Sequence, residues 1–207
     1  MQIQIPYKPR KWQQDAAQNL NRFSTVVVHR RGGKTVWIVN KIIYEVLKCT
    51  KSRPQAAYIA PSYRQARKIA WDYFKEFLAP LVSKNLVKFH ETDLRIDFVN
   101  GAKIYLLGAE DPDSIRGLYF DYVALDEYAQ MPVDFFEKVI RPTLSDRIGG
   151  AVLMGTPSGK NHFYDVYLRG LDPDNKDWSS ILLKWQDTNA LNSEEIDAAW
   201  DRDWETS

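Results

Sequence analysis

A lysine and a threonine behind two glycines are the residues of this sequence best suited to chemistry. The run Gly-Gly-Lys-Thr at 32–35 follows the β-branched segment Thr25–Val28 and precedes an amphipathic stretch. In such a setting backbone N–H groups at a helix N-terminus bind phosphates, the lysine reaches the β- and γ-phosphate oxygens, and the hydroxyl binds Mg²⁺. The usual first glycine is replaced by Val28, and Arg30 and Arg31 precede the glycines. The spacing predicts an irregular nucleotide-binding loop; an ordinary turn before a helix is the alternative.

Two acids end a second apolar run and form the next candidate site. The segment Tyr122–Leu125 leads directly into Asp126 and Glu127. Acids that follow a buried strand are costly unless they lie at its exposed end. In phosphate-loop enzymes this position supplies an aspartate near Mg²⁺ and a glutamate that polarises the attacking water. Because both motifs follow strands, we expect them at the same edge of one sheet.

Three further segments give weaker signals. Thr156 follows another apolar strand, where a hydroxyl can sense a γ-phosphate, although Gly-x-Pro is also a common turn. Arg116 precedes the acidic strand and can neutralise transition-state charge in its own chain or in a neighbouring subunit; a solvated loop arginine is the alternative. Gln13 presents a donor and an acceptor that suit an adenine edge. An N-terminal helix with a buried Trp12 accounts equally well for that segment.

The elements that must position these residues alternate between strand-like and helix-like segments. This alternation predicts a mainly parallel sheet with helices on both faces. A different pattern occupies the middle of the chain, where two strand-like runs flank Asn100-Gly101 and predict an antiparallel hairpin on the sheet edge. We expect strands at Thr25–Val28, Ala56–Ala60, Leu86–His90, Leu94–Val99, Lys103–Leu107, Tyr119–Leu125, Ala151–Met154 and Ser179–Leu183. We expect helices at Lys34–Leu47, Tyr63–Leu78, from Pro132, at Gly159–Leu168 and at Ser193–Trp200.

Length and composition limit the alternatives. The chain has 207 residues, 44% of them hydrophobic, which is enough for one α/β domain with a small appendage. Its 28 basic and 27 acidic residues nearly balance, so any DNA contact must be a local patch. The single cysteine, Cys49, excludes an internal disulfide and a cysteine-rich zinc site. We expect a core over residues 1–170 and a segment, 171–207, with the final strand and a lid-like stretch.

The ordered set of motifs resembles the ATPase domain of the terminase large subunits of tailed bacteriophages, which are DNA-packaging motors. The missing first glycine, and an arginine four residues before Lys34, are typical of that family. The fold implied is a P-loop NTPase of the ASCE, RecA- or terminase-like class. The motifs are Pro-Arg-x-Trp-Gln at 9–13, Arg-x-Gly-Gly-Lys-Thr at 30–35, Ala-Pro-Ser-Tyr-x-Gln-Ala at 60–66, Ile-Arg-Gly at 115–117, Leu-Asp-Glu at 125–127 and Gly-Thr-Pro at 155–157.

The resemblance implies ATP and Mg²⁺ as cofactors and hydrolysis that powers the entry of viral double-stranded DNA into the procapsid. It makes Glu127 the residue that activates water and Arg116 a charge-stabilising arginine acting in trans within a ring. Thr156 would couple hydrolysis to movement, and Thr35 and Asp126 would hold Mg²⁺. The implied nucleotide-binding residues are Tyr7, Arg10, Gln13, Arg30, Arg31, Gly32, Gly33, Lys34 and Thr35.

The resemblance also implies partners and a cellular setting. The partners are double-stranded DNA, the portal protein, the small terminase subunit and further copies of the full-length chain, in the host cytoplasm. Family members continue into a nuclease domain, whereas Ser207 ends this sequence, so we expect an isolated, monomeric ATPase domain without DNA cleavage.

The stretch Trp185–Asn192 resembles the family's lid region. Arg95 and Lys103, beside the predicted hairpin, are candidate DNA contacts; Arg64, Arg67 and Lys68 fit a solvated helix face.

Two other functions remain open at this point. A helicase-like DNA translocase shares the glutamine motif and the Asp-Glu strand, but it needs a second RecA-like domain, and no second lysine-bearing loop follows. A nucleotide-binding interaction module would use ATP only to set its assembly state. The intact pair Lys34 and Glu127 argues against the loss of catalysis.

Overall fold

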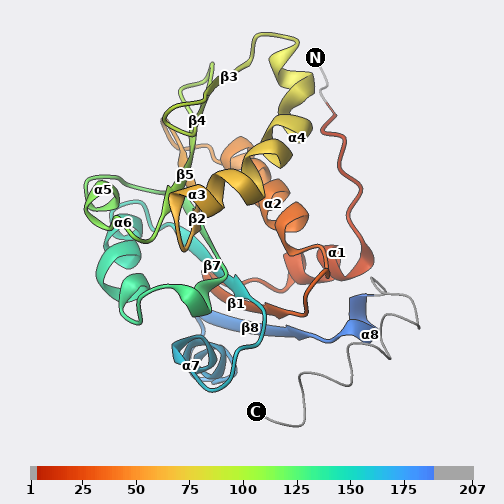
Figure 1. Cartoon of the computed structure of the whole chain (residues 1–207), viewed down its shortest axis with the longest axis vertical. Helices are drawn as coiled ribbons and strands as arrows, with labels where there is room; N and C mark the ends of the chain where they lie inside the picture. Colours follow the sequence, from red (N-terminus) through yellow and green to blue (C-terminus); the bar gives the residue numbers. More distant parts are fainter. Residues whose placement is uncertain (1–3, 189–207) are drawn as a thin grey trace.

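An eight-stranded sheet runs through the protein, whose computed structural model describes residues 4–188 (Figure 1). The strands lie in the order β3-β4-β5-β2-β6-β7-β1-β8. Every pair from β5 to β8 is parallel, and β3, β4 and β5 are antiparallel. The predicted α/β class and the hairpin insertion are both confirmed. The strands are β1 (Phe23–Val28), β2 (Gln55–Ala60), β3 (Val87–His90), β4 (Arg95–Phe98), β5 (Lys103–Gly108), β6 (Tyr122–Asp126), β7 (Gly150–Gly155) and β8 (Trp178–Leu183).

The two faces of the sheet pack against different helices because successive residues of each buried strand point to opposite sides. Val26, Ala124 and Val152 face the helices α1 (Lys11–Gln18), α2 (Lys34–Lys48) and α4 (Asp72–Val82). Val27, Val123 and Leu153 face the opposite helical layer, which includes α6 (Arg141–Ser145) and α7 (His162–Arg169). Central strands covered on both faces read as continuous apolar runs, which is why the sequence predicted them well.

The helix expected over Tyr63–Leu78 is interrupted and longer. It consists of α3 (Tyr63–Ala66), a π-helical turn over Arg67–Trp71, and α4, which extends to Val82. Ser62 caps its N-terminus, since the hydroxyl accepts a hydrogen bond from the Gln65 backbone N–H at 3.2 Å. Trp71, in the widened turn, packs against Phe89 at 5.2 Å and donates from its indole to Glu91. These contacts tie the turn to the segment around β3, which periodicity alone cannot reveal.

Two expected helix starts were wrong. Pro132 lies in a turn, in which its carbonyl accepts a hydrogen bond from the Phe135 backbone N–H. The π-helical segment Phe136–Ile140 begins after this turn and continues into α6. The helix expected from Gly159 begins at His162, because the Asn161 side chain accepts hydrogen bonds from the first backbone N–H groups. Such a capping side chain fixes where a helix can start.

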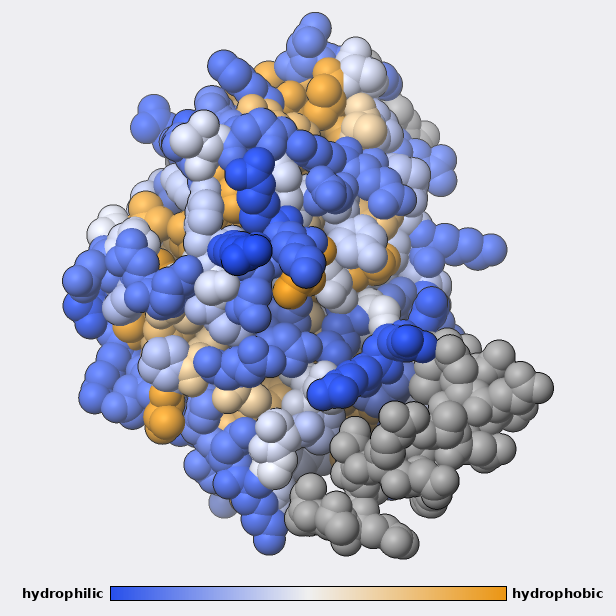
Figure 2. Space-filling view, in the orientation of Figure 1, coloured by the Kyte–Doolittle hydropathy of each residue, from blue (hydrophilic) through white to orange (hydrophobic). Residues whose placement is uncertain are grey.

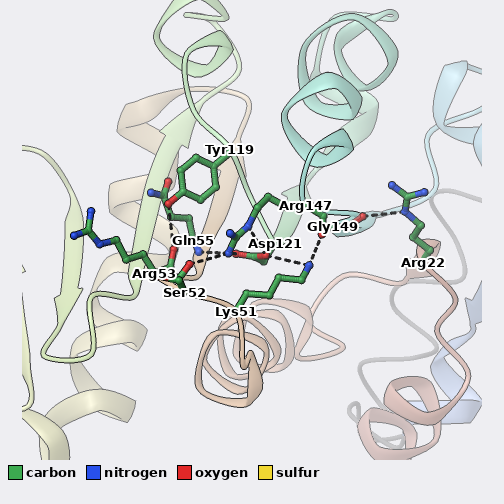
Figure 3. A network of polar contacts seen from close by, with 9 residues as sticks. All are labelled: Arg22, Lys51, Ser52, Arg53, Gln55, Tyr119, Asp121, Arg147 and Gly149. Carbon is green, nitrogen blue, oxygen red and sulfur yellow. Dashed lines mark hydrogen bonds and ion pairs between the residues drawn. The ribbon is translucent and has the colours of Figure 1, made fainter.

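A polar network holds together the edge of the sheet at which the parallel strands begin (Figure 3). Asp121, just before β6, accepts two hydrogen bonds from Arg147, at 3.0 and 3.1 Å, and one from the backbone N–H of Gln55 at 3.0 Å. Lys51 adds an ion pair at 3.3 Å. Hydrogen bonding to Asp121 raises the pKa of Arg147. The network therefore fixes the starts of β2 and β6 relative to each other.

The surface seen in Figure 2 is mostly hydrophilic, with hydrophobic side chains in small separate groups. Within residues 4–188 no helix has the length and apolar character needed to cross a bilayer. The helix expected over Ser193–Trp200 lies outside the described residues, as does half of the lid-like stretch Trp185–Asn192. The short helix α8 (Trp185–Thr188) is the described half of that stretch.

Candidate active site

The glycine-lysine loop, the acid pair and Thr156 meet at the edge where the parallel strands end. They follow β1, β6 and β7, which are neighbours in the sheet. The Lys34 ammonium group donates to the Thr156 hydroxyl at 3.0 Å and lies 3.7 Å from a Glu127 carboxylate oxygen. It also lies 3.4 Å from the Val28 carbonyl. Three motifs that are far apart in the sequence therefore converge on one cation.

The irregular loop has a packing explanation. Val28, at the position of the missing glycine, is fully buried as the last residue of β1. A Cβ atom on Gly32 would lie 2.6 Å from Cγ1 of Val28, so Gly32 must stay without a side chain. Gly33 has a φ of +87°, which glycine adopts without strain. The helix α2 begins at the next residue, and its free N–H groups suit an anion.

Asp126 is the most buried acid of the site. Its side chain is held by the Tyr58 hydroxyl, which donates to Oδ2 at 2.5 Å, and by the backbone N–H of Glu127, which donates to Oδ1 at 3.0 Å. Burial raises the pKa of Asp126 to about 6, against the opposing effect of the Tyr58 hydrogen bond. A carboxylate with so little solvation gains from a nearby cation. Together with the Thr35 hydroxyl it offers the oxygen donors that Mg²⁺ prefers.

Glu127 has a backbone conformation that few non-glycine residues adopt. Its φ and ψ are 54° and 46°, in the left-handed region. Gly155 lies beside this residue, and a Cβ there would lie 3.2 Å from the Phe163 ring and in ordinary contact, at 3.6 Å, with the Glu127 Cα. Backbone strain of this kind costs about 1–3 kcal/mol and concentrates at functional sites. The side chain is 29% exposed, so it can reach a water molecule while contacting Lys34.

Gln13 links the N-terminal segment to the phosphate loop. It is buried, its amide oxygen accepts from Arg10 N at 2.8 Å and from the Tyr7 hydroxyl at 3.0 Å, and its amide nitrogen donates to Gly33 O at 3.2 Å. Burial raises the pKa of Tyr7 to about 12, so the phenol remains a donor. One N–H of the amide is left for a further acceptor. The structure thus brings Tyr7, Arg10 and Gln13 to the loop, as their predicted shared role requires.

Arg116 does not join this group. It ends the short helix α5 (Asp113–Arg116), its side chain is 58% exposed, and it pairs with Asp113 at 2.5 Å. It lines a cavity of about 490 Å³ with Tyr119, Lys138 and Thr143, among others. None of the described residues that line this cavity belongs to the phosphate loop or the acid pair.

The candidate DNA contacts lie in the antiparallel part of the sheet. Arg95 on β4 forms ion pairs with Asp97 at 2.9 Å and Asp93 at 3.4 Å. Asp97 is opposite Lys103 in the register of β4 and β5 and also contacts His90 at 3.0 Å. The charge of Arg95 is therefore largely balanced by its own neighbours.

Two features escaped the sequence analysis. Tyr58 reaches Asp126 from β2, and a tyrosine in an otherwise small and apolar strand was the available signal. His29 lies 2.6 Å from the Thr188 hydroxyl and 2.6 Å from the Arg30 carbonyl. A neutral ring that donates from Nδ1 to this carbonyl can accept from Thr188 at Nε2. This contact joins the phosphate loop to α8, which periodicity cannot foresee.

Several known proteins resemble this chain in sequence and in fold. A family model described as terminase large subunit, T4likevirus-type, N-terminal, matches residues 30–200. The terminase large subunit of Escherichia phage T5 is 29% identical over 183 residues, which are 86% of this chain and 40% of that protein. The chain spans less than half the length of the curated relatives it matches.

Solved structures of large terminases resemble this chain in fold. The large terminase ATPase domain of Thermus phage P74-26 has a TM-score of 0.79 at 25% identity, over 96% of this chain and 88% of that chain. A large terminase of a thermophilic bacteriophage, solved in complex with ADP, has a TM-score of 0.71 at 20% identity, over 95% of this chain and 50% of that chain. The second likeness shows the fold alone.

Proposed function

The chain belongs to the T4likevirus-type family of terminase large subunits, and from this membership we propose that it hydrolyses ATP to drive viral double-stranded DNA into a procapsid. The observation that carries the proposal is the convergence of Glu127 and Thr156 on Lys34, at 3.7 and 3.0 Å. In phosphoryl transfer a protein contributes mainly positioning and charge stabilisation. A cation, an acid and a hydroxyl at one sheet edge supply both.

The nucleotide is held along the N-terminus of α2. Free N–H groups there suit the phosphates, and Lys34 neutralises their charge. The adenine lies towards α1, where Gln13 has an N–H to spare and already contacts the loop through Gly33 O. The ADP held by a relative of the same fold supports a nucleotide of this class. The proposed binding residues are Tyr7, Arg10, Gln13, Arg30, Arg31, Gly32, Gly33, Lys34 and Thr35.

Thr35 and Asp126 would hold Mg²⁺, which neutralises charge on the β- and γ-phosphate oxygens when bound. The fit rests on the donor set, since the buried Asp126 carboxylate and the Thr35 hydroxyl are oxygen ligands of the kind that Mg²⁺ prefers. Glu127 accepts a hydrogen bond from the attacking water and orients it in line with the γ-phosphate. Thr156, bonded to Lys34, senses the change in phosphate charge and relays it to β7.

Arg116 acts on the site of a neighbouring subunit in a homo-oligomeric ring. Its exposure and its single ion pair with Asp113 leave the guanidinium able to enter another surface. An arginine supplied in trans is worth about 10³–10⁵ in rate in well-studied NTPases. A single copy of this chain therefore turns over slowly.

Double-stranded DNA, the portal protein and the small terminase subunit are the proposed partners, and the host cytoplasm is the proposed location. Arg95 and Lys103 are the proposed DNA contacts, although Asp97 already lies beside both in the sheet. Among the described residues no three or more acids, histidines or cysteines lie together as a group able to hold a metal ion.

The test compares Lys34→Ala with Lys48→Ala, a change at the exposed end of the same helix. We expect Lys34→Ala to abolish ATP turnover and to weaken nucleotide binding, and Lys48→Ala to leave both unchanged. The measurements are the rate of phosphate release and the Kd of a fluorescent ATP analogue. Equal turnover in Lys34→Ala and the wild type would overturn the proposal.

A further inference from the structure

The contact between Tyr58 and Asp126 joins a buried phenol to the proposed magnesium ligand. Tyr58 is fully buried on β2, and Asp126 is 3% exposed at the end of β6. The hydroxyl lies 2.5 Å from Oδ2 of the carboxylate. Such a distance is typical of a hydrogen bond from a hydroxyl to an ionised carboxylate.

The register of the sheet explains how the two side chains meet. Tyr58 is opposite Ala124 in the parallel pairing of β2 with β6. Residues 124 and 126 point to the same face, because side chains alternate along a strand. The methyl group of Ala124 leaves room for the phenol to extend towards the strand end. Phe74 of α4 packs edge-on against the Tyr58 ring, with centroids 6.5 Å apart and planes at 80°.

The two hydrogen bonds fix both oxygens of the carboxylate. The Tyr58 hydroxyl donates to Oδ2, and the backbone N–H of Glu127 donates to Oδ1. An ionised carboxylate can only accept, so the phenol must be the donor. The rotation of Asp126 about its own side chain is thereby restrained.

We propose that Tyr58 is a positioning residue, whose hydroxyl holds the Asp126 carboxylate in the orientation that serves Mg²⁺-bound nucleotide. The inference rests on the proposed function and adds a residue from a strand outside the phosphate-loop and acid motifs. Partners that orient metal-ligating side chains commonly change metal affinity by about 10–100-fold when removed. Tyr58→Phe should therefore weaken the Mg²⁺-dependent part of nucleotide affinity by about tenfold.

The chain offers a matched control in Tyr122. This tyrosine is also buried, on β6, and its hydroxyl has no hydrogen-bond partner among the described residues. Tyr122→Phe removes the same atom from the same sheet without touching Asp126. We expect it to leave nucleotide affinity unchanged.

The experiment measures the Kd of a fluorescent ADP analogue in Mg²⁺ and in EDTA for the wild type, Tyr58→Phe and Tyr122→Phe. We expect Tyr58→Phe to raise the Kd about tenfold in Mg²⁺ only, since the hydroxyl acts through Asp126. Equal Kd values for Tyr58→Phe and the wild type in Mg²⁺, or an equal rise in EDTA, would overturn the inference while nucleotide binding stands. No nucleotide binding by the wild type would instead overturn the proposed function.

A second pair of variants tests the same inference as a double-mutant cycle. Asp126→Asn removes the buried charge, and the double variant Asp126→Asn with Tyr58→Phe also removes the phenol oxygen. If Tyr58 acts through Asp126, the single variant Asp126→Asn and the double variant should show the same Mg²⁺ dependence of the Kd. A clear further loss in the double variant would contradict a positioning role.

Discussion

The Lys34 ammonium group lies 3.7 Å from a Glu127 carboxylate oxygen, so the cation of the phosphate loop and the proposed catalytic base neutralise each other. Under the proposed function, phosphate oxygens that approach Lys34 would compete with Glu127 for it. This competition would release Glu127 when a γ-phosphate arrives, which suits a base that must turn towards water. The strained backbone of Glu127 keeps its side chain near that position.

Glu127→Gln should retain ATP binding and lose turnover. The amide keeps the shape of the side chain but cannot take a proton, and general-base catalysis is worth about 10²–10⁴-fold. Single-turnover hydrolysis and the Kd of a fluorescent ATP analogue measure the two effects separately. Near-normal hydrolysis in this variant would remove Glu127 from the role of base.

Arg116→Ala should keep its thermal stability and lose activity that depends on assembly. The side chain is exposed and, among residues 4–188, pairs with Asp113 on the surface, so the fold loses little. In the full-length protein, a mixture of Arg116→Ala with Glu127→Gln subunits should recover turnover, because an intact arginine can serve an intact acid pair in the next subunit. No recovery on mixing would show that Arg116 acts within its own chain.

Gly32→Ala should destabilise the protein, and Gly117→Ala should not. The new Cβ at residue 32 would lie 2.6 Å from the fully buried Val28, whereas at residue 117 nothing lies within 4 Å. Overpacking of this kind costs about 1–3 kcal/mol. Chemical denaturation of both variants measures the difference. Equal free energies of unfolding would mean that the loop has more room than its packing indicates.

Stability should fall as the pH drops below the ordinary histidine pKa of 6.5, in part because of His29. Partial burial lowers its pKa below 6.5, as does the charge of Lys34, against the opposing effects of the Arg30 carbonyl and Asp187. Below pH 6.5 the His29 ring is therefore protonated to a greater extent in the unfolded chain than in the folded chain. The free energy of unfolding then decreases as the pH falls, until the pH has passed the pKa of His29 in the folded chain. His29→Gln should lose less stability over this range. An identical pH dependence in both proteins would exclude His29 as a contributor.

Arg147→Ala should cost about 1–3 kcal/mol of stability, because Asp121 is nearly buried and loses two hydrogen bonds. Lys138→Ala is the control, since its pair with Asp134 is exposed and such pairs contribute about 0.2–1 kcal/mol at most. Thermal unfolding measures both. A cost for Lys138→Ala equal to that for Arg147→Ala would contradict a special role for the network in Figure 3.

Local sequence signals predicted the parts of the fold that depend on local chemistry. Asn100-Gly101 marked the hairpin correctly: Gly101 has a φ of +84°, and the Asn100 side chain accepts from Ala102 N. The continuous apolar strands around Val26 and Val123 were equally clear. The widened helical turn at 67–71 was missed because it depends on contacts of Trp71 with residues near β3. The helix start at His162 was missed because the capping role of Asn161 was overlooked.

The residues of the candidate site also divide into those that the sequence predicted and those that it could not predict. Motif spacing placed Lys34, Glu127 and Thr156 together, because the strands before them end at one sheet edge. The same reasoning could not find Tyr58, whose role depends on the register between β2 and β6 and on the small side chain of Ala124. It also could not separate Arg116 from the group, since a loop arginine carries no signal for the direction in which it points.

The position of β1 between β7 and β8 has a consequence for synthesis on the ribosome. Among the described strands, the one that carries the phosphate loop is translated first, whereas its two neighbours, β7 and β8, are translated last. Long-range pairing of this kind is slow, since the chain must close a large loop first. A nascent chain therefore exposes both edges of β1 until β7 emerges and one edge until β8 emerges, which makes β1 a site for chaperone binding during synthesis.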